Sequence, residues 1–143
     1  MDVGERESQL FSALEESVCS DSDVAFVVAF GSQITGETTR ASDFDIAVKF
    51  ADGVTERDRF EKRCFFSGDL QRDDVPFVDI SDIELLPLDV AHDAVNGRFI
   101  CGDEHAFEEF KTEVENTFAE QREDLRRQHR AVIDRIAEEG LRG

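Results

Sequence analysis

The stretch from residue 24 to residue 50 constrains this chain most, because it joins two apolar segments through a glycine–serine corner and a polar loop. Val24–Phe30 is an uninterrupted apolar run rich in Val and Phe, and Gly31 follows it directly. Such a run, bounded by a glycine, is typical of a buried strand. Ser32 can cap a short turn, and after a polar loop residues 43–50 predict a second strand.

The second strand carries two carboxylates on one side. Side chains alternate between the faces of a strand, so Asp43 and Asp45 share a face with Ala47 and Lys49. The other face is predicted to be the core face, and its residues are Phe44, Ile46, Val48 and Phe50. Two residues along a strand separate the carboxylates by roughly 7 Å, so both can lean onto one or two hard cations, which prefer oxygen ligands. The pattern therefore predicts a Mg²⁺ site.

The Gly31–Ser32 corner predicts a phosphate site beside these carboxylates. A glycine lets the backbone approach a ligand closely, and the free N–H groups at a helix start attract phosphate oxygens. A phosphate cradle joined to magnesium carboxylates is what phosphoryl or nucleotidyl transfer requires. With 34 acidic residues an Asp-x-Asp also arises by chance, as at residues 21–23, which we interpret as a solvated helix end. The combination of an apolar strand, Gly-Ser, a fixed gap and an Asp-x-Asp on an alternating strand is much rarer than an Asp-x-Asp alone, so we favour the catalytic interpretation.

The segment GSQITGETTRASDFDIAV resembles the signature of the DNA polymerase beta-type nucleotidyltransferase superfamily, in particular its minimal nucleotidyltransferase (MNT) branch. The resemblance extends from Val24 to about Phe110. It implies an α/β (α+β) fold, in which helices cover a small mixed β-sheet and a long helix ends the chain. Many MNT proteins are antitoxins paired with a HEPN-domain toxin, and the better-understood ones transfer AMP from ATP to a hydroxyl of that toxin. A HEPN toxin and ATP are therefore the expected partners.

A third carboxylate is expected from a third strand, over residues 75–80, where Pro76 near the start favours a sheet edge. Asp79 ends this apolar run, and an isolated buried carboxylate is costly. The resemblance implies that a third acid on a neighbouring strand completes the metal site and takes the proton of the attacking hydroxyl. We assign that role to Asp79, ahead of the nearby Asp82.

The remaining elements follow from periodicity. An amphipathic helix over residues 5–20 should cover one sheet face. Thr55 can cap a helix that runs to about Gly68. Phe60 and Cys64 should point inward, with Phe65 or Leu70 as further candidates. The basic residues of this helix are expected to pair with its own acids rather than to contact a phosphate, and they are Arg57, Arg59, Lys62 and Arg63. A helix over residues 87–96, a short edge strand over 98–101 and a long helix to about Glu139, which Asp103 can cap, complete the chain.

Composition limits the classes of partner. The chain has 16 basic residues and a net charge of −18, so nucleic-acid binding is not expected. The acidity fits a salt-rich cytoplasm or, alternatively, a basic partner. No apolar run is long enough for a bilayer span, and the N-terminus lacks a signal peptide pattern, so we expect a soluble cytoplasmic protein without membrane contact. Cys19, Cys64 and Cys101 are predicted to be reduced thiols.

Residues 1–143 are expected to form a single nucleotidyltransferase domain, with residues 121–143 as a charged helical extension that either projects or meets another chain. Three functions remain open: AMP transfer to a Tyr, Ser or Thr of a toxin, nucleotide transfer to a small molecule such as an aminoglycoside, and inhibition of a toxin by binding alone. Relatives often have Arg where Thr35 stands, and Arg40 is a candidate to replace it.

Overall fold

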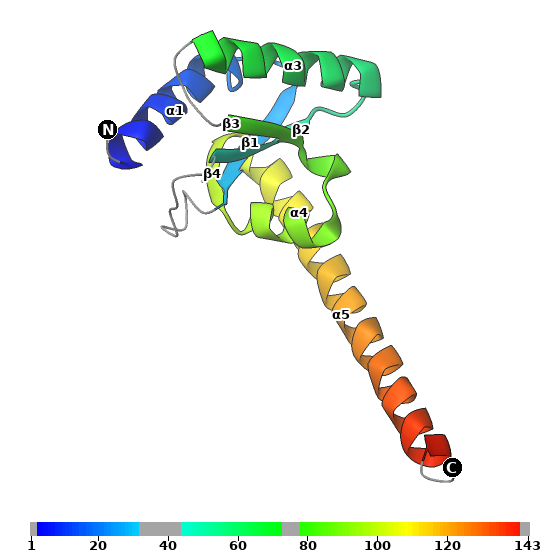
Figure 1. The fold of residues 1–143 in the computed structure, drawn as a ribbon. Coiled ribbons are helices and arrows are strands. Elements are labelled where there is room, and N and C mark those ends of the chain that lie inside the picture. The colour runs from blue at the N-terminus through cyan, green and yellow to red at the C-terminus, as the bar shows by residue number, and fades with distance from the viewer. Residues whose placement is uncertain (1–2, 32–43, 73–77, 141–143) are drawn as a thin grey trace.

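A computed structural model describes residues 3–31, 44–72 and 78–140 (Figure 1). Its elements in chain order are α1 (Val3–Ser17), β1 (Val24–Phe30), β2 (Phe44–Phe50), α3 (Glu56–Arg72), β3 (Val78–Asp82), the short 3₁₀ helix η1 (Ile83–Leu85), α4 (Leu88–Val95), β4 (Arg98–Gly102) and α5 (Glu104–Gly140). Apart from η1, every element was predicted from the sequence, within a few residues at each end.

The described strands form one mixed sheet in the order β3-β2-β1-β4. β1 is antiparallel to both of its neighbours, whereas β2 and β3 are parallel. The two short strands β3 and β4 are the edges, as predicted. This mixed sheet with helices on it and a long final helix confirms the predicted α/β (α+β) fold class.

Helices cover both faces of the sheet, so the molecule has two apolar cores. α1 and α3 cover one face, where Leu14 and Phe66 pack with Val48. α4 and α5 cover the other face, where Val95 and Phe107 pack with residues of β1 and β2. Burying a large apolar side chain fully contributes about 1.5–3 kcal/mol, so both layers hold the sheet in place.

The second core corrects part of the prediction for β2. Ile46, Val48 and Phe50 are buried, as predicted for the core face. Ala47, on the face of the carboxylates, is also fully buried, under α4 and α5. The acidic face is therefore open only near the start of the strand. Alternation assigns each side chain to a face, but it does not show which neighbouring element covers that face.

The inward face of α3 differs from the prediction. Phe60 and Phe65 are 58% and 60% exposed, and Cys64 is exposed as well. Leu70, one of the further candidates, is buried as predicted, and Phe66, which was not predicted, is buried with it. The predicted orientation was wrong because the helix continues to Arg72 and the N-terminal half of its inward face is charged rather than apolar.

That charged half of α3 binds acids from other elements. The Lys62 ammonium lies 2.6 Å from the Asp21 carboxylate and 3.1 Å from that of Asp23. Burial alone would raise the pKa of Asp21, but the hydrogen bonds from Lys62 and from the Asp23 backbone N–H outweigh it and lower that pKa. The Asp-x-Asp at residues 21–23 is therefore a turn that anchors α3, which corrects its interpretation as merely solvated.

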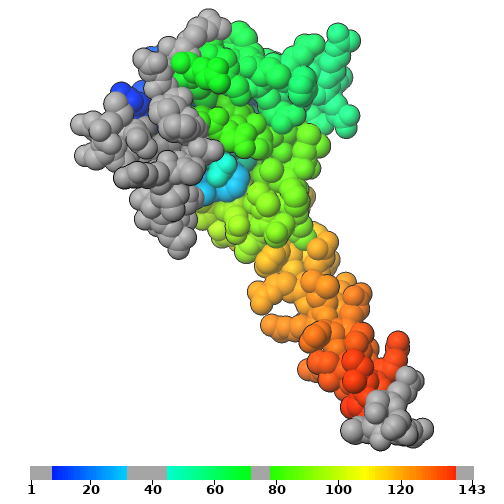
Figure 2. Space-filling view, in the orientation of Figure 1, coloured from blue at the N-terminus to red at the C-terminus, as the bar shows by residue number. Residues whose placement is uncertain are grey.

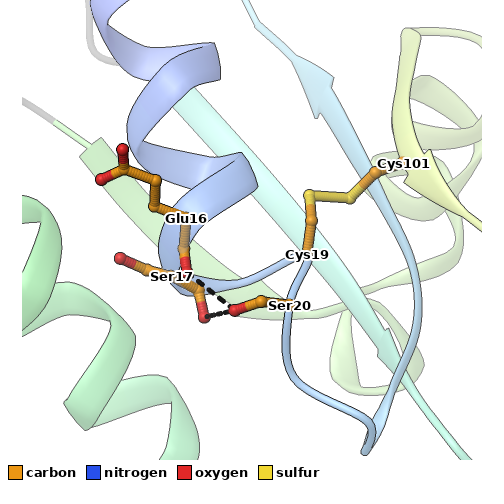
Figure 3. Close-up of a disulfide and its surroundings, with 5 residues drawn as sticks. All are labelled: Glu16, Ser17, Cys19, Ser20 and Cys101. Atoms are coloured by element: carbon orange, nitrogen blue, oxygen red, sulfur yellow. Dashed lines mark hydrogen bonds between the residues drawn. A yellow bond between two sulfur atoms is a disulfide. The ribbon is translucent and has the colours of Figure 1, made fainter.

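A disulfide joins the end of α1 to the edge strand β4 (Figure 3). Cys19 and Cys101 are 82 residues apart in sequence, and their Cα atoms are separated by 6.1 Å, within the usual range. The prediction of three reduced thiols was therefore wrong for this pair. Cys64 is free.

α5 begins at the predicted cap and then leaves the body. Asp103 accepts hydrogen bonds from the backbone N–H groups of His105 and Ala106, at 2.9 and 3.2 Å. Phe107 and Val114 are buried, but every residue from 119 to 137 is exposed, and Figures 1 and 2 show this part extending away from the sheet. Within the described residues no helix is both long and apolar enough to cross a membrane.

Candidate active site at the start of strands β2 and β3

Two of the predicted acids are brought side by side by the pairing of β2 with β3. These strands are parallel, and Asp45 is the register partner of Asp79. Register partners on neighbouring strands point to the same face and lie about 4.8 Å apart across the sheet. Asp79 is exposed and Asp45 is partly buried, so the pair lies at the surface, where a ligand has access.

The glycine of the predicted corner lies against Asp45 of this pair. Gly31 ends β1 with a φ of +99°, a conformation that L side chains rarely adopt. A Cβ atom at this position would lie 2.5 Å from Oδ2 of Asp45. Phe30, the residue before it, is the register partner of Asp45 on the antiparallel strand. The absence of a side chain at Gly31 therefore lets the Asp45 carboxylate lie on the backbone at the corner.

Asp82, the rival candidate for the third acid, has a structural role. It is 1% exposed and caps η1, because its Oδ1 accepts a hydrogen bond from the Glu84 backbone N–H at 3.0 Å. Its Oδ2 lies 3.4 Å from Nε of Arg59, on the α3 side of the sheet. Of the two acids, only Asp79 faces the same side as Asp45 and is exposed to solvent.

Asp43, Ser32, Thr35 and Arg40 lie outside the described residues, so their assignments remain predictions. Among the residues that the structure describes, no group of three His, Cys, Asp or Glu side chains is arranged to hold a metal ion. The donor chemistry of Asp45 and Asp79 nevertheless fits Mg²⁺, which prefers carboxylate oxygens. Two carboxylates at adjacent register positions repel each other, and a bound cation would remove that repulsion.

The sequence analysis missed an ionic network at the other end of β2. Lys49 donates to Glu84 at 2.7 Å, and Arg59 donates to the same carboxylate at 2.6 Å. The hydrogen bond from Lys49 holds the pKa of Glu84 below its ordinary value. Four residues of strand separate Lys49 from Asp45, which is about 13 Å, so Lys49 does not belong to the acidic site. No motif in the sequence indicated that η1 and α3 would meet here.

The family model described as Polymerase beta, Nucleotidyltransferase matches residues 13–106. This range contains α3 and all the described strands together with Asp45 and Asp79. No functionally curated protein matches the chain.

Solved structures that contain similar chains include toxin–antitoxin complexes. One is a toxin–antitoxin structure with AMP-PNP, 22% identical, with a TM-score of 0.59, covering 92% of this chain and 98% of that one. A mutant MntA–HepT toxin–antitoxin pair with two aspartates, two positions apart, changed to glutamate is 20% identical, with a TM-score of 0.59 and coverage of 96% and 99%. The third is the complex of a tri-AMPylated Shewanella oneidensis HEPN toxin with an MNT antitoxin. Its matching chain is 18% identical, with a TM-score of 0.54, and the match covers 95% of this chain and 99% of that one. These likenesses show that the fold is shared.

Proposed function

We infer the function of this chain from its family membership: it belongs to the polymerase beta nucleotidyltransferase family. Within that family, we propose that it transfers AMP from ATP to a hydroxyl group of a partner HEPN toxin and thereby neutralises the toxin. In this reaction the acceptor oxygen forms a bond to the α-phosphorus of ATP, the bond to the bridging oxygen breaks, and pyrophosphate leaves.

The observation that carries the proposal is the meeting of three features at one place. Asp45 and Asp79 are register partners, and the Asp45 carboxylate lies on Gly31. A phosphate-binding corner beside two oxygen donors positions a triphosphate and neutralises its charge, and these two effects dominate catalysis of phosphoryl transfer.

The roles follow from position. Gly31 offers backbone that a triphosphate can approach closely, and Ser32 is assigned a hydrogen bond to a phosphate oxygen. Asp43, Asp45 and Asp79 would hold Mg²⁺, which when bound supplies charge neutralisation at the phosphates. Asp79, on the exposed edge strand, is the residue that an incoming hydroxyl reaches, so we assign to it acceptance of the hydroxyl proton.

The partner assignment draws on the structures with the same fold. One of them holds AMP-PNP, an ATP analogue, and another contains an AMPylated HEPN toxin with its MNT antitoxin. A third carries changes at two aspartates with the spacing of Asp43 and Asp45. These properties belong to those proteins, and together with the geometry here they favour AMP transfer to a toxin over transfer to a small molecule.

The test is incubation of the purified chain with α-³²P-ATP, Mg²⁺ and the product of the adjacent gene, which we expect to be the HEPN toxin. We expect label on the toxin, and a loss of labelling of at least about 100-fold in Asp45→Asn and in Asp79→Asn, because each change removes a charged oxygen donor without changing side-chain size. Asp52→Asn is the matched control, since Asp52 is fully exposed in the turn after β2 and should keep full activity.

Two results would contradict the proposal. Toxin that is inhibited without label, equally well by the wild type and by both aspartate variants, would show an antitoxin that acts by binding alone. Labelling that persists in Asp45→Asn and Asp79→Asn would show that transfer occurs elsewhere. Omitting Mg²⁺ and adding EDTA tests the metal separately, and we expect labelling to stop.

A further inference from the structure

The outer half of α5 is an exposed helix with an apolar stripe. Residues 121–137 make up this segment, called the tail here, and all of them are exposed. Its four large aliphatic side chains are 50–64% exposed, and they are Leu125, Val132, Ile133 and Ile136. Most of the stability of a protein helix comes from packing of its apolar face, and in the described residues nothing packs on this one.

The stripe has the spacing of a helix that docks on another surface. Leu125 and Val132 are seven residues apart and Ile136 follows four later, so the three side chains lie on one side of the tail. Arg122 and His129 alternate with them at steps of three or four residues. Arg122, Leu125, His129 and Val132 line one shallow hollow together with Arg126 and Gln128. The stripe is thus a mixed seam, apolar in the middle and basic at its margin.

The base of the tail is fixed to the body. His92 of α4 stacks on Phe118 with ring centroids 3.9 Å apart and an 8° angle between the rings. The Arg122 guanidinium lies 5.9 Å from the centre of the same Phe118 ring. Because the stack of His92 on Phe118 joins α4 to α5 at the point where α5 leaves the sheet, the tail presents its seam in a defined direction.

The tail reverses the charge of the chain. Residues 1–120 contain 29 acidic and 10 basic residues, whereas the tail contains 3 acidic and 5 basic residues. Arg127 is already paired with Glu123 and Asp124, within 3.8 and 4.0 Å. Among the described residues, no carboxylate lies within ion-pair distance of Arg126 or Arg130. Their positive charge therefore remains available to a partner.

The tail is long enough to separate this charge from the acidic body. Seventeen helical residues span about 25 Å at a rise of 1.5 Å per residue. The Debye length is about 8 Å at physiological ionic strength, so the charge of the body is screened over most of the tail. An acidic partner that the body would repel can therefore approach the outer seam.

From these observations we propose that the tail is the docking surface for the toxin, and that the toxin face which binds it is apolar with carboxylates at its edge. This inference rests on the proposed function for the identity of the partner. A second copy of the chain fits less well, because two facing seams would bring arginines against arginines while both bodies carry a large negative charge. Docking on the tail leaves the acidic site on the sheet free for ATP.

The experiment measures the dissociation constant for purified toxin without ATP, using the full chain. Leu125→Gln combined with Val132→Gln keeps helix propensity and removes the apolar centre of the seam, and we expect binding to weaken at least tenfold. Arg126→Glu should weaken it about fivefold or more and flatten its dependence on salt. Matched controls are Leu85→Gln, an exposed leucine on η1, and Arg127→Glu on the paired side of the tail, which should stay within twofold.

The outcomes separate this proposal from the proposed function. In labelling assays the tail variants should raise KM for the toxin with little change in kcat, whereas Asp45→Asn should lose transfer and keep binding. Unchanged binding by both tail variants overturns the docking surface and leaves the proposed function standing. A wild-type chain that does not bind the toxin overturns both. Sedimentation tests the alternative of self-association. If the wild-type chain alone is a dimer and the Leu125→Gln, Val132→Gln variant is a monomer, the tail joins two copies of the chain and the proposal is overturned. Circular dichroism confirms that each variant keeps its helices.

Discussion

Replacement of Gly31 by alanine tests whether the glycine corner positions the Asp45 carboxylate. The new Cβ would stand 2.5 Å from Oδ2 of Asp45, far inside van der Waals contact. The carboxyl group ends a short side chain, so it can rotate away at small energetic cost, but it then leaves its place beside Gly31. A misplacement of about 1 Å at a reacting centre can lower the rate about 100-fold, and we expect a loss of AMP transfer of that order.

Stability should respond to the same change in a separate way. A residue with a Cβ at positive φ costs roughly 1–2 kcal/mol, which for a domain of this size lowers Tm by roughly 3–8 °C. Gly53→Ala is the matched control, because Gly53 has a φ of +91° and a Cβ there would have no neighbour within 4 Å. Both variants should lose similar stability in urea titrations, but only Gly31→Ala should lose transfer.

Two results would refute this reasoning. Full labelling of toxin by Gly31→Ala would show that the position of the Asp45 carboxylate against the corner is irrelevant to catalysis. An equal loss of activity in Gly53→Ala would show that the effect arises from general destabilisation. The labelling assay is therefore run at a temperature at which both variants are fully folded by circular dichroism.

Three further predictions concern stability. Asp82→Ala should lower the free energy of unfolding by about 3 kcal/mol, because it breaks a buried ion pair and a helix cap, whereas Asp79→Ala should change it by less than about 0.5 kcal/mol; urea titration measures both. The hydrogen bond from Lys49 lowers the pKa of Glu84 below its ordinary 4.5, so the stability it contributes is complete above pH 4.5 and is lost as the pH falls through the folded value. The difference in unfolding free energy between the wild type and Glu84→Gln should therefore shrink between pH 6 and pH 3. Reduction of the disulfide should lower the free energy of unfolding by about 4 kcal/mol, because the bond closes a loop of 82 residues in the unfolded chain. The Cys19→Ser variant should be as stable as the reduced wild type, and its stability should not change with reductant.

The elements predicted correctly were those whose boundaries are set by residues within the element itself. Asp103 and Thr55 were predicted as helix caps, and both accept the expected backbone hydrogen bonds. The apolar run of β1 predicted a buried strand, and four of its seven residues are fully buried. In each case the responsible residues lie within one turn or one strand, so no distant contact had to be known.

The predictions that failed depended on contacts between distant segments. Hydrophobic periodicity assigned Phe60 to the inward face of α3, but Phe66 is the residue that is buried there. The helix is also oriented by Arg59 and Lys62, which bind acids more than twenty residues away in the sequence. The disulfide likewise depends on β4 pairing beside β1, which brings Cys101 to the end of α1. A sequence read locally contains neither of these long-range contacts.

The acidic site lies between these two cases, and it shows what a motif can and cannot specify. Alternation along β2 placed Asp45 on one face, and alternation along β3 placed Asp79 on a face of its own strand. Neither pattern fixes the relative register, and a slip of one residue in β3 would bring Val78 or Ile80 opposite Asp45 and turn Asp79 to the opposite face. The burial of Ile80 under α1 and α3, and of Asp82 against Arg59, prevents that slip. The residues that hold the register are thus not the residues of the motif, so the catalytic geometry we propose depends on a core and an ion pair on the opposite side of the sheet.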